Sequence, residues 1–434
     1  MKVTHSTLLV AALVLSAATA RAQDIPNPSQ GDTTVTRNFP NHTAGEFTPA
    51  KGFDIFRTDR ASLNISFYGL FRYVNQLPAD QVFTDHLGRE RAVDPRNDLN
   101  WHRTMVWLTG FFFVPQFRYN ITLWSLATTQ QSLLFGNLQY YFSPGLTIGV
   151  GLLPNLTARS MQGSWPFWAG SDRQMAEDFF RGGFSSGVFI GSQPIARLFY
   201  TASVNTNLSQ LGVTAANDTR DVSLSASVFW MPSTGEFGPR GGFGDLEHHE
   251  NVATRFGVSV GHSREARYAS DNVPPNATQI KLSDGVNPFD TGALADGVTV
   301  QKLDYDLVAV DAGLKYRGFS FQGEYYVRQL SNFRADGPLP LTSILDHGFM
   351  AQAMYMVKPK KVGMYLSSGY VFDDFGREPW EFGGGVSIYP SGTRSWRLNL
   401  HVMRVERSPA SSSFGYYIAG QSGTILSLGT DILM

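Results

Sequence analysis

Hydrophobic and polar residues alternate with a period of two along most of this chain. Near residue 63, Leu63, Ile65 and Phe67 share one face, and Asn64 and Ser66 share the other. Such alternation predicts β-strands with one apolar and one polar side. The best helical pattern is short and covers residues 172–180. The pattern therefore predicts an all-β protein with one short helix.

The alternating segments number sixteen, and their connections differ in length at the two ends. Tight turns such as 114–116, 143–145 and 358–360 alternate with long loops such as 75–101 and 406–422. Short turns at one end and long loops at the other are typical of a transmembrane β-barrel. The links 127–131 and 231–251 depart from this alternation. The expected strands are 63–74, 102–113, 117–126, 132–142, 146–153, 186–190, 196–206, 221–230, 252–262, 304–316, 319–329, 348–357, 362–373, 380–389, 395–405 and 423–434.

A soluble two-sheet protein would also show alternation, but sixteen strands with one-sided loops are unusual for a sandwich. Closing the sheet removes the exposed edges that so large an open sheet would leave. In lipid the apolar face must point outward, so the polar face must line the interior. Sixteen strands are enough to enclose an aqueous channel. We therefore expect an all-β, transmembrane antiparallel barrel of about 16 strands that functions as a porin for small solutes.

The first residues have the features of an export signal. Lys2 precedes the apolar run 8–15, and Ala20-Arg21-Ala22 matches an A-x-A cleavage site. We expect residues 1–22 to be a cleaved signal peptide, 23–50 to be a flexible polar segment, and 51–434 to form the barrel. This organisation places the protein in a bacterial outer membrane, in contact with its lipid.

Charge and cysteine content exclude several functions. The chain has no cysteine, which removes thiol chemistry and cysteine metal sites. It carries 35 basic and 36 acidic residues, and loss of Lys2 and Arg21 leaves 33 against 36, a net charge of −3. That balance argues against nucleic acid as a partner.

Residues 154–185 form the most informative loop. They carry three arginines, three acids and several large aromatic residues, namely Trp165, Phe167, Trp168, Phe179 and Phe180 with Phe184 at the end. A surface loop would not need so many large aromatics. We expect the loop to fold into the barrel and constrict it, with aromatics against the wall and charges toward the passage.

Basic residues in this loop and on the predicted inner wall are the candidate selectivity residues. Basic rings in a narrow pore attract anions, so we expect a mild preference for anions, although neutral solutes are also admitted. The candidates are Arg72, Arg118, Arg159, Arg173, Arg181, Arg197 and Arg328.

Candidate chemistry beyond a pore is weak. Asp245, Glu247, His248, His249 and Glu250 could bind a metal, but adjacent histidines in a polar connection are more often solvated. The chain contains no G-x-S-x-G and no H-E-x-x-H motif. We therefore expect no metal site, no cofactor and no enzymatic activity. The alternative is a non-porin outer-membrane barrel, either a surface enzyme or a structural anchor.

From about Val150 onward, the chain resembles the phosphate-selective porin O and P family. The resemblance rests on VGLLPNLTARS and WAGSDRQMAEDFFRGGFSSGVFIG between Val150 and Gly191. GLKYRGFSFQGEYYVRQ and GFMAQAMYMVKPKKVGMYLSSGY resemble family strands in order and spacing. The similarity covers about the last two-thirds of the chain, and none of its motifs is strict. It implies a homotrimer of 16-stranded barrels that admit anions such as phosphate.

Overall fold

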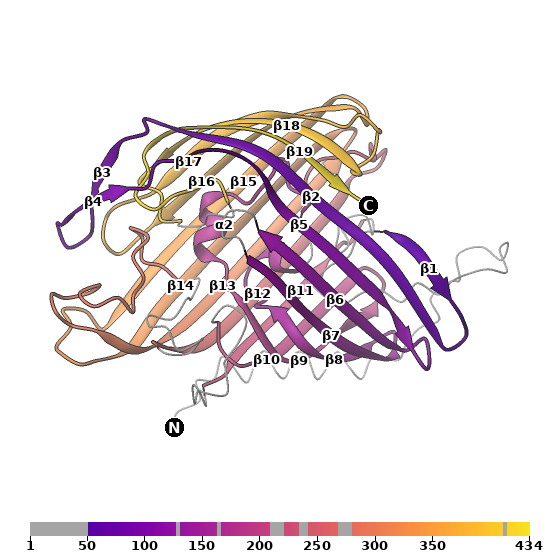
Figure 1. Cartoon of the computed structure of the whole chain (residues 1–434), viewed down its shortest axis with the longest axis horizontal. Coiled ribbons are helices and arrows are strands. Elements are labelled where there is room, and N and C mark those ends of the chain that lie inside the picture. Colours follow the sequence, from indigo (N-terminus) through magenta and orange to yellow (C-terminus); the bar gives the residue numbers. More distant parts are fainter. Residues whose placement is uncertain are drawn as a thin grey trace.

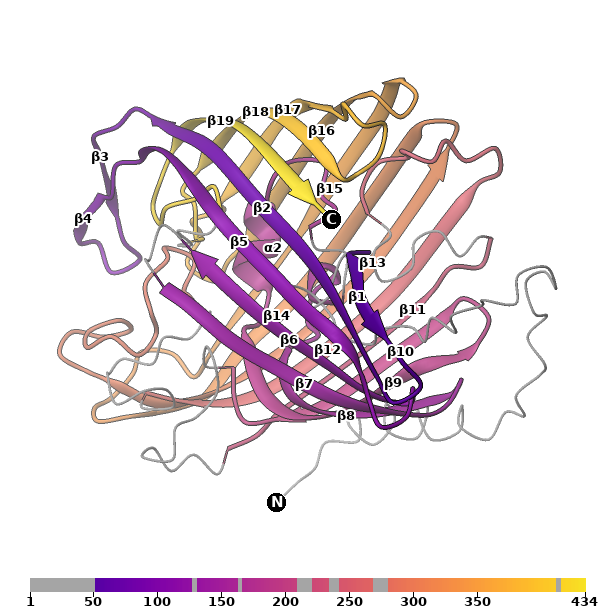
Figure 2. The same ribbon diagram turned by 45° about the vertical axis from the view of Figure 1, so that its right-hand side comes forward.

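The computed structural model describes residues 51–126, 131–162, 166–208, 221–233, 242–267, 280–410 and 415–434. Sixteen strands form a closed antiparallel barrel, with the loop segment that contains α2 inside it (Figures 1 and 2). The barrel closes where β19 pairs with β2, for example at Leu433 and Tyr68. The barrel strands are β2 Ala61–Leu77, β5 Asn97–Phe112, β6 Phe117–Leu126, β7 Gln131–Ser143, β8 Leu146–Pro154, β9 Phe184–Ile195, β10 Leu198–Asn205, β11 Ser223–Trp230, β12 Ala253–Ala266, β13 Val300–Tyr316, β14 Phe319–Ala335, β15 Ser343–Lys358, β16 Val362–Phe372, β17 Trp380–Ile388, β18 Trp396–Glu406 and β19 Gly423–Leu433.

The remaining elements are short. β1 (Phe53–Arg57) pairs with β2, and β3 (Gln81–Thr84) pairs with β4 (Glu90–Val93) in a separate hairpin. The 3-10 helix η2 (Arg159–Gln162) and the helix α2 (Met175–Phe180) lie in the loop between β8 and β9. None of the helices in the described ranges has the length and apolar character needed to span a membrane.

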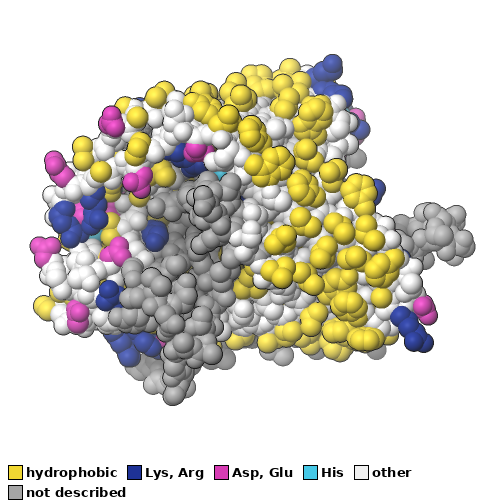
Figure 3. Space-filling view, viewed as in Figure 1, with side chains coloured by type: hydrophobic (Ala, Val, Ile, Leu, Met, Phe, Trp, Pro, Cys, Tyr) yellow, Lys and Arg dark blue, Asp and Glu magenta, His cyan; other side chains and the backbone are white. Residues whose placement is uncertain are grey.

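Alternation along each strand decides which side chains face outward. On β18, Leu398, Leu400 and Val402 are exposed, whereas Arg397 and His401 are buried inside the barrel. Figure 3 shows the apolar side chains gathered in a broad band, with many charges at the end that carries the β3–β4 hairpin. An apolar outer surface around a polar interior is the arrangement that lipid requires of a spanning barrel.

The predicted fold class is confirmed, and each of the sixteen predicted segments overlaps one barrel strand. Several bounds were wrong, because strands continue beyond the residues whose alternation is clear. The strand expected at 186–190 extends over Phe184–Ile195, and the turn expected at 192–194 lies instead around Arg197, which has a φ of 65°. The β3–β4 hairpin within the loop 75–101 was not predicted.

Candidate functional site: the infolded loop and the inner wall

The loop between β8 and β9 lies inside the barrel, as predicted. Its described residues from Asn155 to Gly183 are buried, except that Phe167 is partly exposed. Trp165, one of the aromatics noted in the sequence, lies outside the described residues. The loop reaches β11 through Asn155, whose Nδ2 donates to Ser223 Oγ at 2.9 Å. It also contacts β14, β17 and β18, so it crosses much of the barrel interior.

Aromatic residues fix α2 against the wall. Phe180 stacks on Tyr326 of β14, with ring centroids 5.0 Å apart. Tyr305 of β13 donates its hydroxyl to the Phe180 carbonyl at 3.0 Å. The guanidinium of Arg328 lies 4.0 Å from the centroid of Phe179, a cation–π distance. The packing role predicted for these aromatics is therefore observed.

Wall carboxylates bind backbone N–H groups of the loop. Glu324 of β14 accepts from the Arg159 amide at 2.8 Å, and Glu381 of β17 accepts from the Met175 amide at 2.8 Å. Each bond satisfies a buried backbone N–H group, which would lower the stability of the fold if it had no acceptor in this interior. The two acids thus act as anchors for η2 and α2.

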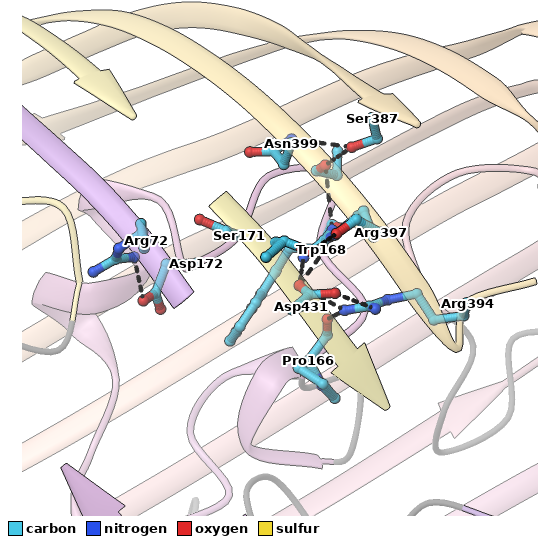
Figure 4. A network of polar contacts seen from close by, with 12 residues as sticks. Arg72, Pro166, Trp168, Ser171, Asp172, Ser387, Arg394, Arg397, Asn399 and Asp431 are labelled. Atoms are coloured by element: carbon cyan, nitrogen blue, oxygen red, sulfur yellow. Dashed lines mark hydrogen bonds and ion pairs between the residues drawn. The ribbon is translucent and has the colours of Figure 1, made fainter. Parts of the chain in front are cut away.

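A second set of anchors joins β18 and β19 to the loop (Figure 4). Asp431 forms ion pairs with Arg397 and Arg394, the latter with Nη1 at 2.6 Å. Arg397 also donates to the Trp168 carbonyl at 2.6 Å, and Arg394 donates to the Pro166 carbonyl at 2.8 Å. Each guanidinium therefore links one wall carboxylate to the loop backbone.

Arg72 on β2 holds the next part of the loop. Its Nη1 lies 3.0 Å from Asp172 Oδ2, and both side chains are buried. Arg103 on β5 approaches the same oxygen at 3.5 Å. Two wall arginines therefore share one carboxylate of the loop.

The loop between β18 and β19 also enters the barrel. Its residue Tyr416 is buried, and the backbone N–H of Ser171 donates to the Tyr416 hydroxyl at 2.8 Å. The neighbouring Tyr417 hydroxyl donates to Glu381. The Gly415 carbonyl accepts from Arg72 at 2.7 Å. This second loop therefore packs directly on the first.

The structure places the seven predicted selectivity residues in different environments. Arg159, Arg173 and Arg181 are all buried in the infolded loop, and Arg72 and Arg328 are buried on the wall beside it. Arg118 is partly exposed at the start of β6 and donates to the Pro115 carbonyl at 3.3 Å. Arg197 is exposed in the β9–β10 turn, where it donates to the Ser233 carbonyl at 2.8 Å. The turn position arises because β9 is longer than predicted.

Most of these arginines have an acidic neighbour. Within the loop, Arg181 pairs with Asp178 at 2.8 Å, and Arg173 lies 3.6 Å from Glu177. On the wall, Arg328 pairs with Asp346. Pairing reduces the net field of each guanidinium, because the two opposite charges nearly cancel at a distance.

Arg103 and His102 were missed by sequence reasoning. Both are buried although they are consecutive, because β5 carries an irregularity where Leu70 pairs with Arg103 and Phe71 pairs with Trp101. A bulge adds one residue and changes which faces the next residues occupy. Alternation alone does not show where a bulge occurs, so no sequence signal would have identified this pair.

Acidic and histidine side chains in the connection before β12 also lie close together. One ligand atom from each of Asp245, Glu247 and His249 lies within 4.8 Å of the others. Asp245 is fully buried and accepts from the Gly318 amide at 2.7 Å, and its carboxylate also contacts the His249 ring. These bonds give Asp245 a structural role in fixing the connection.

The β3–β4 hairpin has its own charged cluster outside the spanning strands. Burial alone would raise the pKa of Asp85, but hydrogen bonds from Arg91 and Arg89 outweigh it and lower that pKa to about 2. Asp284 Oδ2 lies 2.7 Å from His86 Nδ1. Burial alone would raise the pKa of Asp284, but its hydrogen bonds with His86 outweigh burial and lower that pKa. These contacts connect the hairpin to the loop before β13.

Comparison with known proteins adds evidence on the fold. No protein-family model and no curated protein matches the chain. The chain is similar to outer-membrane expressed OmpT of Vibrio cholerae, with 11% identity, a TM-score of 0.53, and coverage of 88% of this chain and 100% of that one. In-vitro folded OmpT gives 12% identity, a TM-score of 0.51, and coverage of 88% and 99%. The outer membrane channel DcaP of Acinetobacter baumannii gives 11% identity, a TM-score of 0.51, and coverage of 88% and 99%.

At such identities the similarity concerns the fold alone. The resemblance to porins holds at this level, whereas the phosphate-selective family stays a prediction. The expectation that the chain is not an enzyme is wrong. The fold is shared with OmpT as well as with a channel protein, and a shared barrel fold at 11% identity does not exclude catalysis. The chain is a porin-like β-barrel with the fold of bacterial outer-membrane proteins.

Proposed function

We propose that the protein is an outer-membrane porin through which small solutes diffuse passively. The observation that carries this proposal is the burial of the described residues of the loop 154–185 inside a barrel that is polar within and apolar outside. A loop held across the interior narrows a wide barrel and selects solutes by size and charge. The function then follows from geometry and requires no bound group.

We also propose a mild preference for anions. Arg72, Arg159 and Arg328 lie where the loop meets the wall, and two charges 4 Å apart interact by about 4 kcal/mol at an effective dielectric of 20. Nearby acids such as Asp172 and Asp346 reduce this effect by pairing. The preference is therefore mild, and small anionic or neutral solutes both pass.

Two finer features of the proposal follow from the sequence resemblance: relationship to the phosphate-selective porins and assembly as a homotrimer in the outer membrane. A third, removal of residues 1–22, follows from the export-signal features of the first residues. Cross-linking of the detergent-extracted protein tests the trimer, and a monomer at high protein concentration would count against it.

The experiment that tests the function is conductance in a planar bilayer. The purified protein should produce discrete current steps in potassium chloride. A folded, heat-modifiable barrel that inserts and yet passes no current would refute the porin proposal.

The zero-current potential across a salt gradient tests selectivity. The double variant Arg173→Ala with Arg181→Ala should shift this potential toward cations, because it leaves loop acids without their basic partners. Arg197→Ala is the matched control, since Arg197 lies in an exposed turn and should leave the potential unchanged. A wild-type pore that prefers cations would contradict the proposed preference.

A further inference from the structure

The short turns at one end of the barrel differ in charge around its rim. The turn between β5 and β6, residues 113–116, and the turn between β7 and β8, residues 144–145, contain no charged residue. By contrast, Arg317 lies in the turn between β13 and β14, Lys358 ends β15, and Lys360 lies in the turn that follows. Figure 3 shows lysine and arginine side chains at this end, next to the apolar band. The short turns are therefore basic on one part of the rim and uncharged on another.

Backbone contacts hold the two basic turns side by side. The Gly318 carbonyl accepts a hydrogen bond from the Met356 N–H at 2.8 Å, which joins the β13–β14 turn to the end of β15. Phe319, the first residue of β14, pairs with Tyr355 of β15. Lys358 follows Tyr355 by three residues on the same strand. Strand pairing therefore brings the residues of the two turns to the same stretch of the rim.

The basic side chains of these turns are open to solvent. Lys358 and Lys360 are exposed, and neither forms an ion pair in the part of the chain that the structure describes. Arg317 Nε lies 3.8 Å from a carboxylate oxygen of Glu250, but the two side chains are 61% and 74% exposed. Exposed ion pairs are weak, so Glu250 does little to neutralise Arg317. A phosphate group can therefore approach all three basic side chains from outside the barrel.

The geometry of the turns does not require basic residues. Lys360 has a φ of 60° and Arg317 a φ of 46°, in the left-handed region that favours glycine and asparagine. A hydrogen bond from the Lys361 N–H to the Lys358 carbonyl, at 3.0 Å, closes the lysine turn through backbone atoms alone. An uncharged residue would therefore satisfy the fold at both positions, and the positive charges need another explanation.

A row of aromatic side chains lies beside these turns on the outer surface. Strand pairing aligns Tyr316 of β13 with Phe319 of β14, and Phe319 with Tyr355 of β15. The three side chains are 37%, 40% and 54% exposed. Aromatic rings are enriched where a spanning barrel meets the boundary between membrane and water. The row therefore marks the level of the lipid headgroups, next to the basic turns.

We propose that this part of the rim binds an anionic phospholipid. Short turns lie on the periplasmic side of an outer-membrane barrel, where the leaflet consists of phospholipids. The ammonium and guanidinium groups bind the lipid phosphate, and the aromatic row contacts the acyl chains. A zwitterionic lipid carries a positive charge of its own and is held less tightly. The inference depends on insertion into the membrane and not on conduction. The site consists of Arg317, Lys358, Lys360, Tyr316, Phe319 and Tyr355.

Native mass spectrometry of the detergent-extracted barrel tests the site. The protein is titrated with phosphatidylglycerol and, separately, with phosphatidylcholine of the same acyl chains, and the dissociation constant of the first bound lipid is measured. Wild type should bind phosphatidylglycerol more tightly. Each basic residue near an anionic lipid contributes a factor of about five in affinity. The double variant Lys358→Gln with Lys360→Gln should therefore weaken phosphatidylglycerol binding by about 25-fold and leave phosphatidylcholine binding unchanged.

Arg197→Gln is the matched control, since Arg197 is an exposed basic residue in the β9–β10 turn, outside the site, and its loss should leave the binding of both lipids unchanged. If the double variant does not fold, high salt provides the test on wild type, because screening should weaken the binding of phosphatidylglycerol alone. Equal affinity of wild type for the two lipids, or equal affinity for phosphatidylglycerol in wild type and the double variant, would overturn the site. Displacement of the lipid by an equal concentration of inorganic phosphate would also overturn it, because it would show a site for free phosphate. A barrel without ion current would refute the porin function and leave this site intact.

Discussion

Removal of the Asp431 carboxylate should release part of the infolded loop from the wall. Asp431 is the shared partner of Arg394 and Arg397, and these arginines hold the carbonyls of Pro166 and Trp168 (Figure 4). In Asp431→Ala both guanidinium groups keep their charge and lose their carboxylate. They should then turn toward water and give up the loop carbonyls.

The size of the effect follows from burial. The side chains of Asp431 and Arg397 are 1% and 0% exposed. Removal of one member of a buried ion pair costs about 3–5 kcal/mol. Since 1.4 kcal/mol is a factor of ten, 4 kcal/mol shifts the equilibrium between docked and released loop by about three orders of magnitude.

Amide hydrogen exchange measures this equilibrium directly. Exchange in peptides that cover residues 166–172 should accelerate by about three orders of magnitude in Asp431→Ala, including the amide of Ser171 that is bonded to Tyr416. Open-channel current noise should rise in parallel.

Glu406→Ala is the matched control. Arg404 and Glu406 pair at 3.3 Å on the same strand β18, but their side chains are 53% and 31% exposed. Exposed pairs contribute about 0–1 kcal/mol, so exchange in the loop should not change. Equal exchange rates in wild type and Asp431→Ala would refute the anchoring role, as would the same acceleration in Glu406→Ala.

Three further predictions concern other parts of the barrel. The pKa of Asp85 is lowered from 3.8 to about 2. The ionised carboxylate therefore stabilises the β3–β4 hairpin fully above about pH 4, and this stabilisation is lost as the pH falls through 2. The rate of proteolysis of the hairpin should show this pH dependence in wild type and not in Asp85→Asn. Gly110→Ala should lower the thermal midpoint, because its Cβ would lie 1.9 Å from the Ser62 carbonyl and overpacking costs about 1–3 kcal/mol; an unchanged midpoint would contradict the close approach. Tyr416→Phe should loosen the loop between β18 and β19, because it leaves the buried Ser171 amide without its acceptor at a cost of about 1–3 kcal/mol. Amide hydrogen exchange in residues 415–420 should then increase, whereas Tyr355→Phe, at an exposed tyrosine, should leave it unchanged.

The sequence by itself determined the barrel. Lipid accepts only an apolar outer surface, and this requirement appears in the sequence as alternation with period two. The strand that carries Leu398 and Leu400 outward and Arg397 inward was identified in this way, as were the other fifteen. The infolding of the loop was predicted from a different signal, its large aromatic residues, which need a buried surface.

Only the tertiary structure decided which side chains meet across the interior. Asp172 is 100 residues away from Arg72 in the sequence, and Asp431 is more than 260 residues away from Trp168. The proximity of the residues in each pair therefore depends on closure of the barrel and on the path of the loop. The β5 irregularity at His102 and the entry of Tyr416 into the barrel likewise depend on contacts between distant segments. A periodic pattern reports the environment of each strand face, whereas partners at such separations are chosen by three-dimensional packing.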